Sequence, residues 1–180
     1  VGNGCLRVGL EPKLFTGFHE YKISKFTETN YVPYSITNPW IEIIEKLYAD
    51  LYPEPDVVHW MKMWDSQAIE PRESDAAVLF WVGGGSNGKS SKVSAMAKTL
   101  GKQYTCKIPI TLLTSNYEDA GNANSAYAMM EGKTFARFTE PNKLMSLNTG
   151  RLKEVFGGED QTSREVYGSQ KNWEMKATPT

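Results

Sequence analysis

One short motif in the sequence has residue types and spacing suited to binding phosphate. Gly83 is followed, after four residues, by Gly88, Lys89 and Ser90, which fits the pattern G-x-x-x-x-G-K-[ST]. Glycines let backbone N–H groups turn inward around phosphate oxygens, and the N-terminus of a following helix adds partial positive charge. Lys89 would reach the β- and γ-phosphates of a nucleoside triphosphate, and the Ser90 hydroxyl would bind Mg²⁺. The predicted cofactor-binding residues are Gly83, Gly84, Gly85, Ser86, Asn87, Gly88, Lys89, Ser90 and Ser91.

The residues on either side of this loop have the character of a strand and a helix. The apolar run over residues 76–82 predicts a buried strand, and residues 91–100 predict a helix that ends at Gly101. Strand, loop and helix in this order are the setting that a phosphate-binding loop requires. A glycine-rich turn without a ligand is the alternative, but three glycines and a lysine are a poor composition for a plain turn.

The overall composition is that of an ordinary globular protein. Hydrophobic residues make up 40% of the 180 residues, and the formal net charge is −1. This length allows one α/β domain with a smaller appendage. Because no global positive field attracts nucleic acid, such binding would need a local patch or assembly into a ring. Cys5 and Cys106 indicate free thiols in a reducing compartment, and no zinc site is expected.

The sequence gives few signals of location. It contains no apolar run of membrane-spanning length and no signal-peptide pattern, so no membrane partner is expected. Because the chain begins at Val1 without a Met, we expect it to be a piece of a longer protein.

A polar stretch over residues 70–75 is the best candidate for a domain boundary. Before it, glycines punctuate residues 1–33, as in small β-turn structure. A helix is then predicted over residues 37–51 with Asn38 as its cap, and Asp56 is expected to cap a second helix. We therefore expect a partial N-terminal domain over residues 1–72 and a P-loop domain over residues 73–180.

After the boundary, strands and helices alternate. A short helix is predicted over residues 126–130, a strand over 133–139 and a helix over 148–156, and two final strands over 162–167 and 173–178 would form a hairpin. A triphosphatase also needs an acid that holds Mg²⁺ or polarises water, placed at the end of a neighbouring strand. Glu140 follows the predicted strand and is the leading candidate, although a surface Glu before a turn proline is equally compatible with the local pattern.

Four blocks of sequence resemble superfamily 3 helicases, most closely the poxvirus-type primase–helicases of large DNA viruses and their phage and plasmid relatives. The blocks are WVGGGSNGKS (81–90), EGKTFARFTEPN (131–142), LKEVFGGEDQTSREVYG (152–168) and NGCL (3–6). The second block is similar to the family's Walker B strand. The third is similar to its K-x-[LVF]-x-G-G-D…R signature and is the most specific of the four.

The resemblance implies an α/β fold, namely the parallel sheet and helices of an AAA+-like P-loop NTPase, preceded by a small, mostly helical segment. It also implies an ATP-dependent DNA helicase in viral or mobile-element replication, truncated at both ends. ATP and Mg²⁺ would be its cofactors, single-stranded DNA its partner, and a homo-oligomeric ring, expected to be a hexamer, its assembly. Lys89 and Glu140 become the catalytic pair, and Ser90 and Glu140 the metal ligands.

In the family, the region of the third block carries a hairpin that grips single-stranded DNA. Lys153, Asp160 and Arg164 match the signature. The expected DNA-binding side chains are Lys153, Arg164 and Lys171. Tyr167 or Trp173 could stack on a base, but packing in the core is favoured for Trp173.

The sequence departs from the family pattern in two respects. Thr139 stands where many relatives have a second acid. The sensor asparagine and the arginine finger are expected downstream of Thr180, so the fragment itself is expected to bind nucleotide but to lack parts needed for turnover.

Two functions from other classes remain open. The first is a P-loop small-molecule kinase, which would need an arginine-rich lid that the sequence does not show. A GTPase is disfavoured, because the sequence contains no N-K-x-D motif. A nucleotide-binding assembly module without turnover is the second alternative. If the protein is viral, its location is intracellular, in the host cytoplasm or nucleus.

Overall fold

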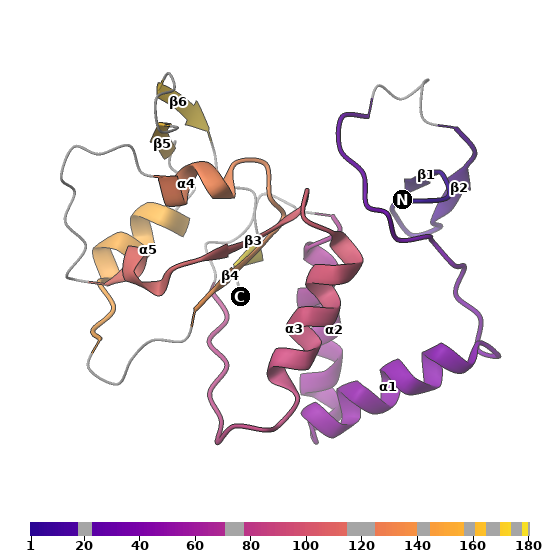
Figure 1. The fold of residues 1–180 in the computed structure, drawn as a ribbon. Helices are drawn as coiled ribbons and strands as arrows, with labels where there is room; N and C mark the ends of the chain where they lie inside the picture. The colour runs from indigo at the N-terminus through magenta and orange to yellow at the C-terminus, as the bar shows by residue number, and fades with distance from the viewer. Residues whose placement is uncertain are drawn as a thin grey trace. The chain divides into compact units, whose positions relative to one another are not determined.

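A computed structural model of the chain describes residues 1–17, 23–70, 78–114, 125–139 and 145–156, with the backbone of strands 161–164, 170–173 and 178–179. Packing divides the chain into two compact units (Figure 1). The first unit comprises residues 1–70 and 81–103, and the second comprises residues 71–80 and 104–180.

The first unit begins with a small hairpin. Strands β1 (Cys5–Arg7) and β2 (Lys13–Phe15) pair antiparallel, with Cys5 opposite Phe15. The β-turn structure expected near the N-terminus is thereby confirmed, because glycines around short apolar fragments permit tight reversals of the chain.

Two capped helices follow. Helix α1 (Pro39–Leu51) begins as predicted, since the Asn38 side chain accepts a hydrogen bond from the Trp40 N–H at 3.1 Å. Helix α2 (Pro55–Gln67) is also confirmed, but its N-cap is Glu54 and not Asp56. Asp56 lies in the first turn, where a negative charge favours the positive end of the helix dipole.

Helix α3 (Lys89–Leu100) confirms the helix predicted after the glycine loop. It ends at Gly101, whose φ of 78° lies in the left-handed region that glycine adopts without strain. The Thr27 and Thr29 hydroxyls both donate to the Thr99 carbonyl, at 2.6 and 2.8 Å. Residues from the N-terminal segment therefore satisfy the C-terminal end of α3.

The predicted strand over residues 76–82 is wrong for the part that the structure describes. Residues 78–82 form no strand, and Phe80 and Val82 are 54% and 94% exposed. Val78 packs against the hydrophobic core of the second unit, whereas the Trp81 ring packs edge-on against Tyr52 in the first unit. The apolar run thus packs partly in the second unit, through Val78, and partly in the first unit, through Trp81, and it is not buried as one strand.

The second unit is built on a parallel sheet in the order β3-β4-β7. Its strands are β3 (Thr105–Ile108), β4 (Phe135–Phe138) and β7 (Thr178–Pro179). Thr105 lies opposite Phe135, and Phe135 lies opposite Thr178. Strand β4 confirms, with shorter bounds, the strand predicted over residues 133–139. With its helices the sheet is an α/β arrangement compatible with a P-loop fold.

The core of the second unit lies among these elements. A 3-10 helix η2 (Ile110–Leu113) follows β3, and helices α4 (Ser125–Met130) and α5 (Thr149–Phe156) confirm the predicted helices. The buried cluster consists of Ile108, Ile110, Leu112, Leu113, Met130, Val155 and Phe156. Burial also raises the pKa of the free Cys106 thiol to about 11, so it is protonated at neutral pH.

The predicted C-terminal hairpin is only partly confirmed. Strands β5 (Gln161–Arg164) and β6 (Gln170–Trp173) pair antiparallel, with Gln161 opposite Trp173. The second strand was predicted to begin at Trp173, but β6 ends there. Thr178, where the predicted strand ends, and Pro179 instead form β7, which pairs with β4 in the parallel sheet. The prediction followed the apolar alternation after Trp173, but strand pairing is made by backbone groups and accepts the polar residues 170–172.

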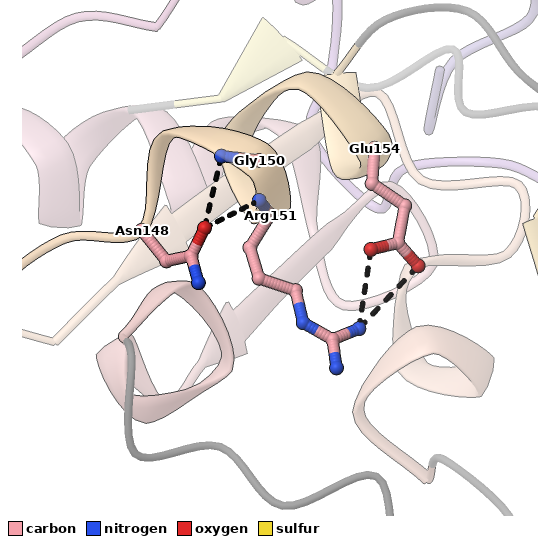
Figure 2. Close-up of polar contacts among 4 residues, drawn as sticks. All are labelled: Asn148, Gly150, Arg151 and Glu154. Carbon is pink, nitrogen blue, oxygen red and sulfur yellow. Dashed lines mark hydrogen bonds and ion pairs between the residues drawn. The ribbon is translucent and has the colours of Figure 1, made fainter.

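Helix α5 has a local N-cap (Figure 2), and the capping residue also bonds to η2. The Asn148 side-chain oxygen accepts from the N–H groups of Gly150 and Arg151, at 2.9 and 3.2 Å. The Asn148 N–H donates to the Leu113 carbonyl at 2.8 Å. One turn further on, Arg151 pairs with Glu154 at 3.1 Å. This capping fixes the start of the helix that buries Val155 and Phe156 in the core.

We expect Asn148→Ala to lower the free energy of unfolding by about 1 kcal/mol, because two helix N–H groups lose their acceptor. Asn148→Asp keeps the acceptor and is the matched control. Urea unfolding followed by circular dichroism measures both variants, and equal stability of Asn148→Ala and the unchanged chain would contradict this role.

Candidate functional site

The glycine loop has the backbone conformation of a concave turn. Gly85, Ser86 and Gly88 have φ values of 85°, 50° and 81°. Among the described residues, Ser86 is the one non-glycine with a positive φ. An anion-binding nest is formed by successive backbone N–H groups in right-handed/left-handed pairs or turns, and positive φ values in a turn are compatible with it. The backbone of the loop is therefore compatible with close approach of a negatively charged group.

Lys89 turns back over this loop. Its Nζ donates to the Asn87 Oδ1 at 2.8 Å. A Cβ added at Gly83 would lie 2.6 Å from the Asn87 Nδ2 and 2.8 Å from the Lys89 Nζ. A Cβ at Gly84 or Gly85 would meet nothing within 4 Å. The first glycine and the lysine thus bound a small cradle that any side chain at position 83 would fill, and its donor set fits a phosphate group.

The start of α3 adds uncapped donors to the cradle. Gly88 is the N-cap residue and has no side chain with which to satisfy the first N–H groups of the helix. The first turn contains no acidic residue, and Ser90 and Ser91 are exposed. A helix N-terminus of this kind attracts anions through its free N–H groups and its dipole.

The base of the loop packs on the end of α1. A Cβ added at Gly88 would lie 2.9 Å from the Leu51 Cδ2. The Trp81 ring, just before the loop, lies edge-on to the Tyr52 ring at a centroid distance of 6.3 Å. Both ends of the loop therefore pack on the C-terminal end of α1, at Leu51 and the C-cap residue Tyr52.

A buried ion pair one turn into α3 was not predicted from the sequence. The Lys92 Nζ lies 2.5 Å from the Asp65 Oδ2, with side chains only 3% and 8% exposed. The Tyr48 hydroxyl donates to the same carboxylate oxygen. The Lys92 Nζ also lies 4.9, 5.3 and 4.8 Å from the ring centroids of Tyr48, Tyr52 and Trp81. This group of five residues, the Lys92 cluster, joins α1 and its C-cap residue Tyr52, α2, α3 and Trp81, which lies two residues before the loop.

Burial determines the electrostatics of the Lys92 cluster. It lowers the pKa of Lys92, and the nearby Asp65 carboxylate opposes that change. Burial and the bond to Asp65 raise the pKa of Tyr48, so its hydroxyl stays protonated and remains a donor. The sequence signal for Lys92 was weak, since only its spacing with Met96 and the buried Leu100 indicates an inward helix face.

The other predicted site residues are not brought together by the described structure. Glu140 and Asp160 lie outside the described residues, as does Tyr167. Lys153 is exposed on α5. Arg164 lies opposite Gln170, and Lys171 opposite Ser163, in the β5–β6 hairpin, and neither these side chains nor that of Trp173 is described. The pairing of Lys89 with Glu140 and the DNA contacts thus stay predictions.

Thr139, interpreted from the sequence as a departure from the family pattern, has a structural role. Its hydroxyl accepts from the Ile110 N–H at 2.9 Å, and its own N–H donates to the Ile108 carbonyl at 3.1 Å. These bonds tie the end of β4 to the turn after β3.

Over the described ranges, no group of three or more His, Cys, Asp or Glu could hold a metal ion. No helix there is both long and apolar enough to cross a membrane.

No protein-family model matches the chain. An African swine fever virus protein named "Putative primase" is 40% identical over 179 residues, which are 99% of this chain and 19% of that protein. Two proteins named "Putative helicase" also match. The one from frog virus 3 is 35% identical over 67% of the chain and 12% of its own length. The one from Acanthamoeba polyphaga mimivirus is 26% identical over 81% and 15%.

Fold and loop together define an α/β protein with a Gly-Lys-Ser loop at the start of a helix. The chain belongs to the family formed by these proteins of large DNA viruses, and it spans about a fifth of the length of the African swine fever virus relative. The resemblance to primase–helicases of large DNA viruses is thereby confirmed, and membership of superfamily 3 stays a prediction.

The loop conformation predicts unequal tolerance of alanine at two neighbouring glycines. Gly88→Ala should cost about 1–2 kcal/mol of unfolding free energy, because a Cβ is strained at φ 81° and meets Leu51. Gly84→Ala, with open space around its Cβ, is the matched control and should leave stability unchanged. Thermal unfolding of both variants checks this, and equal losses at the two positions would contradict the loop geometry.

Proposed function

We propose that this chain is the nucleotide-binding part of a superfamily 3 DNA helicase that acts in viral or mobile-element DNA replication. ATP hydrolysis would drive single-stranded DNA through a ring of subunits. The observation that carries the proposal is the glycine loop, which turns back on Lys89 at the uncapped start of α3. The names of the frog virus 3 and mimivirus relatives support helicase over other P-loop functions.

The loop would bind the phosphates of ATP through backbone N–H groups, and Lys89 would supply the positive charge. The Lys89 Nζ is held at 2.8 Å by a neutral amide oxygen of Asn87, so a phosphate oxygen with full negative charge would be a stronger acceptor for it. The Ser90 hydroxyl would bind Mg²⁺, which, when present, neutralises charge on the β- and γ-phosphates. The positive charge of Lys89 would likewise stabilise the transition state, where the negative charge on the transferred phosphoryl group is largest.

Glu140 would be the catalytic base or water-positioning group. It follows Thr139, whose two hydrogen bonds fix the end of β4. As the Walker B acid that the resemblance implies, Glu140 would bind Mg²⁺ and orient water in line with the departing diphosphate. In a ring, an arginine from the next subunit would complete the site, and such residues contribute about 10³–10⁵ in rate.

Single-stranded DNA would contact the chain through a few basic residues. The candidates are Lys153, exposed on α5, and Arg164 and Lys171 in the β5–β6 hairpin. With a net charge of −1, one chain attracts DNA weakly, but a ring places several copies of these residues around one channel. Binding should then tolerate changes of base sequence and weaken as salt rises.

The test compares ATP binding and turnover in the full-length protein that contains this chain. We expect Lys89→Ala to weaken Mg²⁺–ATP binding about 10–100-fold, because a charge-assisted contact is lost. Glu140→Gln should retain binding and lose hydrolysis. Both substitutions should abolish turnover stimulated by single-stranded DNA. Lys98 is an exposed lysine of the same helix as Lys89, and Lys98→Ala should change neither ATP binding nor turnover. Calorimetry and a phosphate-release assay measure these quantities.

The same assay separates the competing functions. Turnover that depends on a small acceptor and not on DNA would indicate a kinase. Tight ATP binding without turnover would indicate an assembly module. Hydrolysis that survives in Lys89→Ala would contradict the proposal.

A further inference from the structure

Helix α3, which carries the loop lysine, is held by residues that precede the loop. Asp65 of α2 pairs with Lys92 near the start of α3, so the two helices lie side by side (Figure 1). At the other end of α3, Thr27 and Thr29 donate to the Thr99 carbonyl. The orientation of α3 is thus set from outside the phosphate-binding motif.

The Lys92–Asp65 pair is a poor source of stability for its size. Both side chains are nearly inaccessible to water, and burying two charges carries a desolvation penalty that close contact only partly offsets. Replacing buried pairs with well-packed apolar residues is often neutral or stabilising. Stability alone therefore does not account for two charges at this position.

The pair fixes how the helices that it joins are oriented. One oxygen of Asp65 accepts from both the Lys92 ammonium and the Tyr48 hydroxyl, so one atom links three helices. The rings of Tyr48, Tyr52 and Trp81 surround the ammonium at 4.8 to 5.3 Å. Hydrogen bonds to a charged group require a particular geometry, whereas apolar contacts are non-directional and allow helices to rotate or slide.

Lys92 lies one turn from the phosphate-binding residues. Its N–H donates to the Gly88 carbonyl at 3.0 Å, and Lys89 is three residues before it in the same helix. Any rotation of α3 would therefore carry Lys89 and Ser90 with it. Lys92 cannot itself be a phosphate ligand here, because its ammonium is buried against Asp65 and the three rings.

We propose that Lys92 is a positioning residue for the nucleotide site. Its contact with Asp65 and Tyr48 sets the rotation of α3 on α1 and α2, so that Lys89 and Ser90 face the glycine loop. The inference rests on the proposed function, since it assigns a position to groups that bind ATP. It makes the helices before the loop part of the phosphate-binding machinery, although they contribute no ligand.

The experiment removes the two charges together and separates folding from binding. Lys92→Met alone should lower the thermal midpoint, because Asp65 is left buried without its cation. Adding Asp65→Leu should restore the midpoint. The double variant should still bind Mg²⁺–ATP about tenfold more weakly by calorimetry, and residues 83–90 should lose the protection from hydrogen exchange that ATP gives the unchanged chain.

Lys62→Met is the matched control. Lys62 also lies over the Tyr48 ring, at 5.6 Å, and pairs with Glu45 of a neighbouring helix, but its side chain is 37% exposed. The affinity of the Lys62→Met variant for Mg²⁺–ATP should stay within twofold of that of the unchanged chain, since an exposed ion pair contributes little to the orientation of the helices.

Three outcomes decide the matter. A double variant that binds Mg²⁺–ATP as tightly as the unchanged chain overturns the positioning role and leaves the proposed function intact. Absence of saturable binding by the unchanged chain overturns both. If the double variant does not fold, Asp65→Asn keeps the size of the side chain and an acceptor for Tyr48 but removes the charge. Its affinity, measured below its own melting temperature, must then fall several-fold, and an unchanged affinity overturns the inference.

Discussion

The orientation of α3 is the constraint on which the candidate site depends. A lysine on a helix can reach a phosphate bound by the preceding loop only if helix and loop are held in one fixed relation. In this chain that relation is maintained by a buried ion pair between Lys92 and Asp65 and by the packing of Gly88 on Leu51. The N-terminal helices thus form the surface on which the glycine loop is built.

Much of the fold could be predicted from the sequence wherever the signal is local. The start of α1 and the end of α3 follow from Asn38 and Gly101, whose side-chain or backbone properties act within one turn, whereas α3 begins at Lys89, two residues before its predicted start. Strand predictions were less reliable, because an apolar run such as residues 76–82 indicates neither which of its side chains are buried nor which strand would pair with it. The shift of the second hairpin strand has the same origin, since strand pairing depends on partners distant in the sequence.

For the candidate site the same division holds. The cradle around Lys89 is encoded in eight consecutive residues, and Gly85 and Gly88 adopt the positive φ values that glycine permits. The Lys92–Asp65 pair could not be predicted, because a lysine and an aspartate on two separate helices are ordinarily solvated charges, and only the tertiary fold buries them together. The partnership of Lys89 with Glu140 stays a prediction, since Glu140 lies outside the described residues.

The central claim is that Lys89 is a phosphate ligand. A crystal structure with Mg²⁺ and a non-hydrolysable ATP analogue tests it most directly. The account predicts that the Lys89 Nζ leaves Asn87 and lies about 2.7–2.9 Å from an oxygen of the β- or γ-phosphate, the usual range for a charge-assisted hydrogen bond. A bound analogue whose phosphates lie away from the glycine loop, with Lys89 still bonded to Asn87, would contradict it.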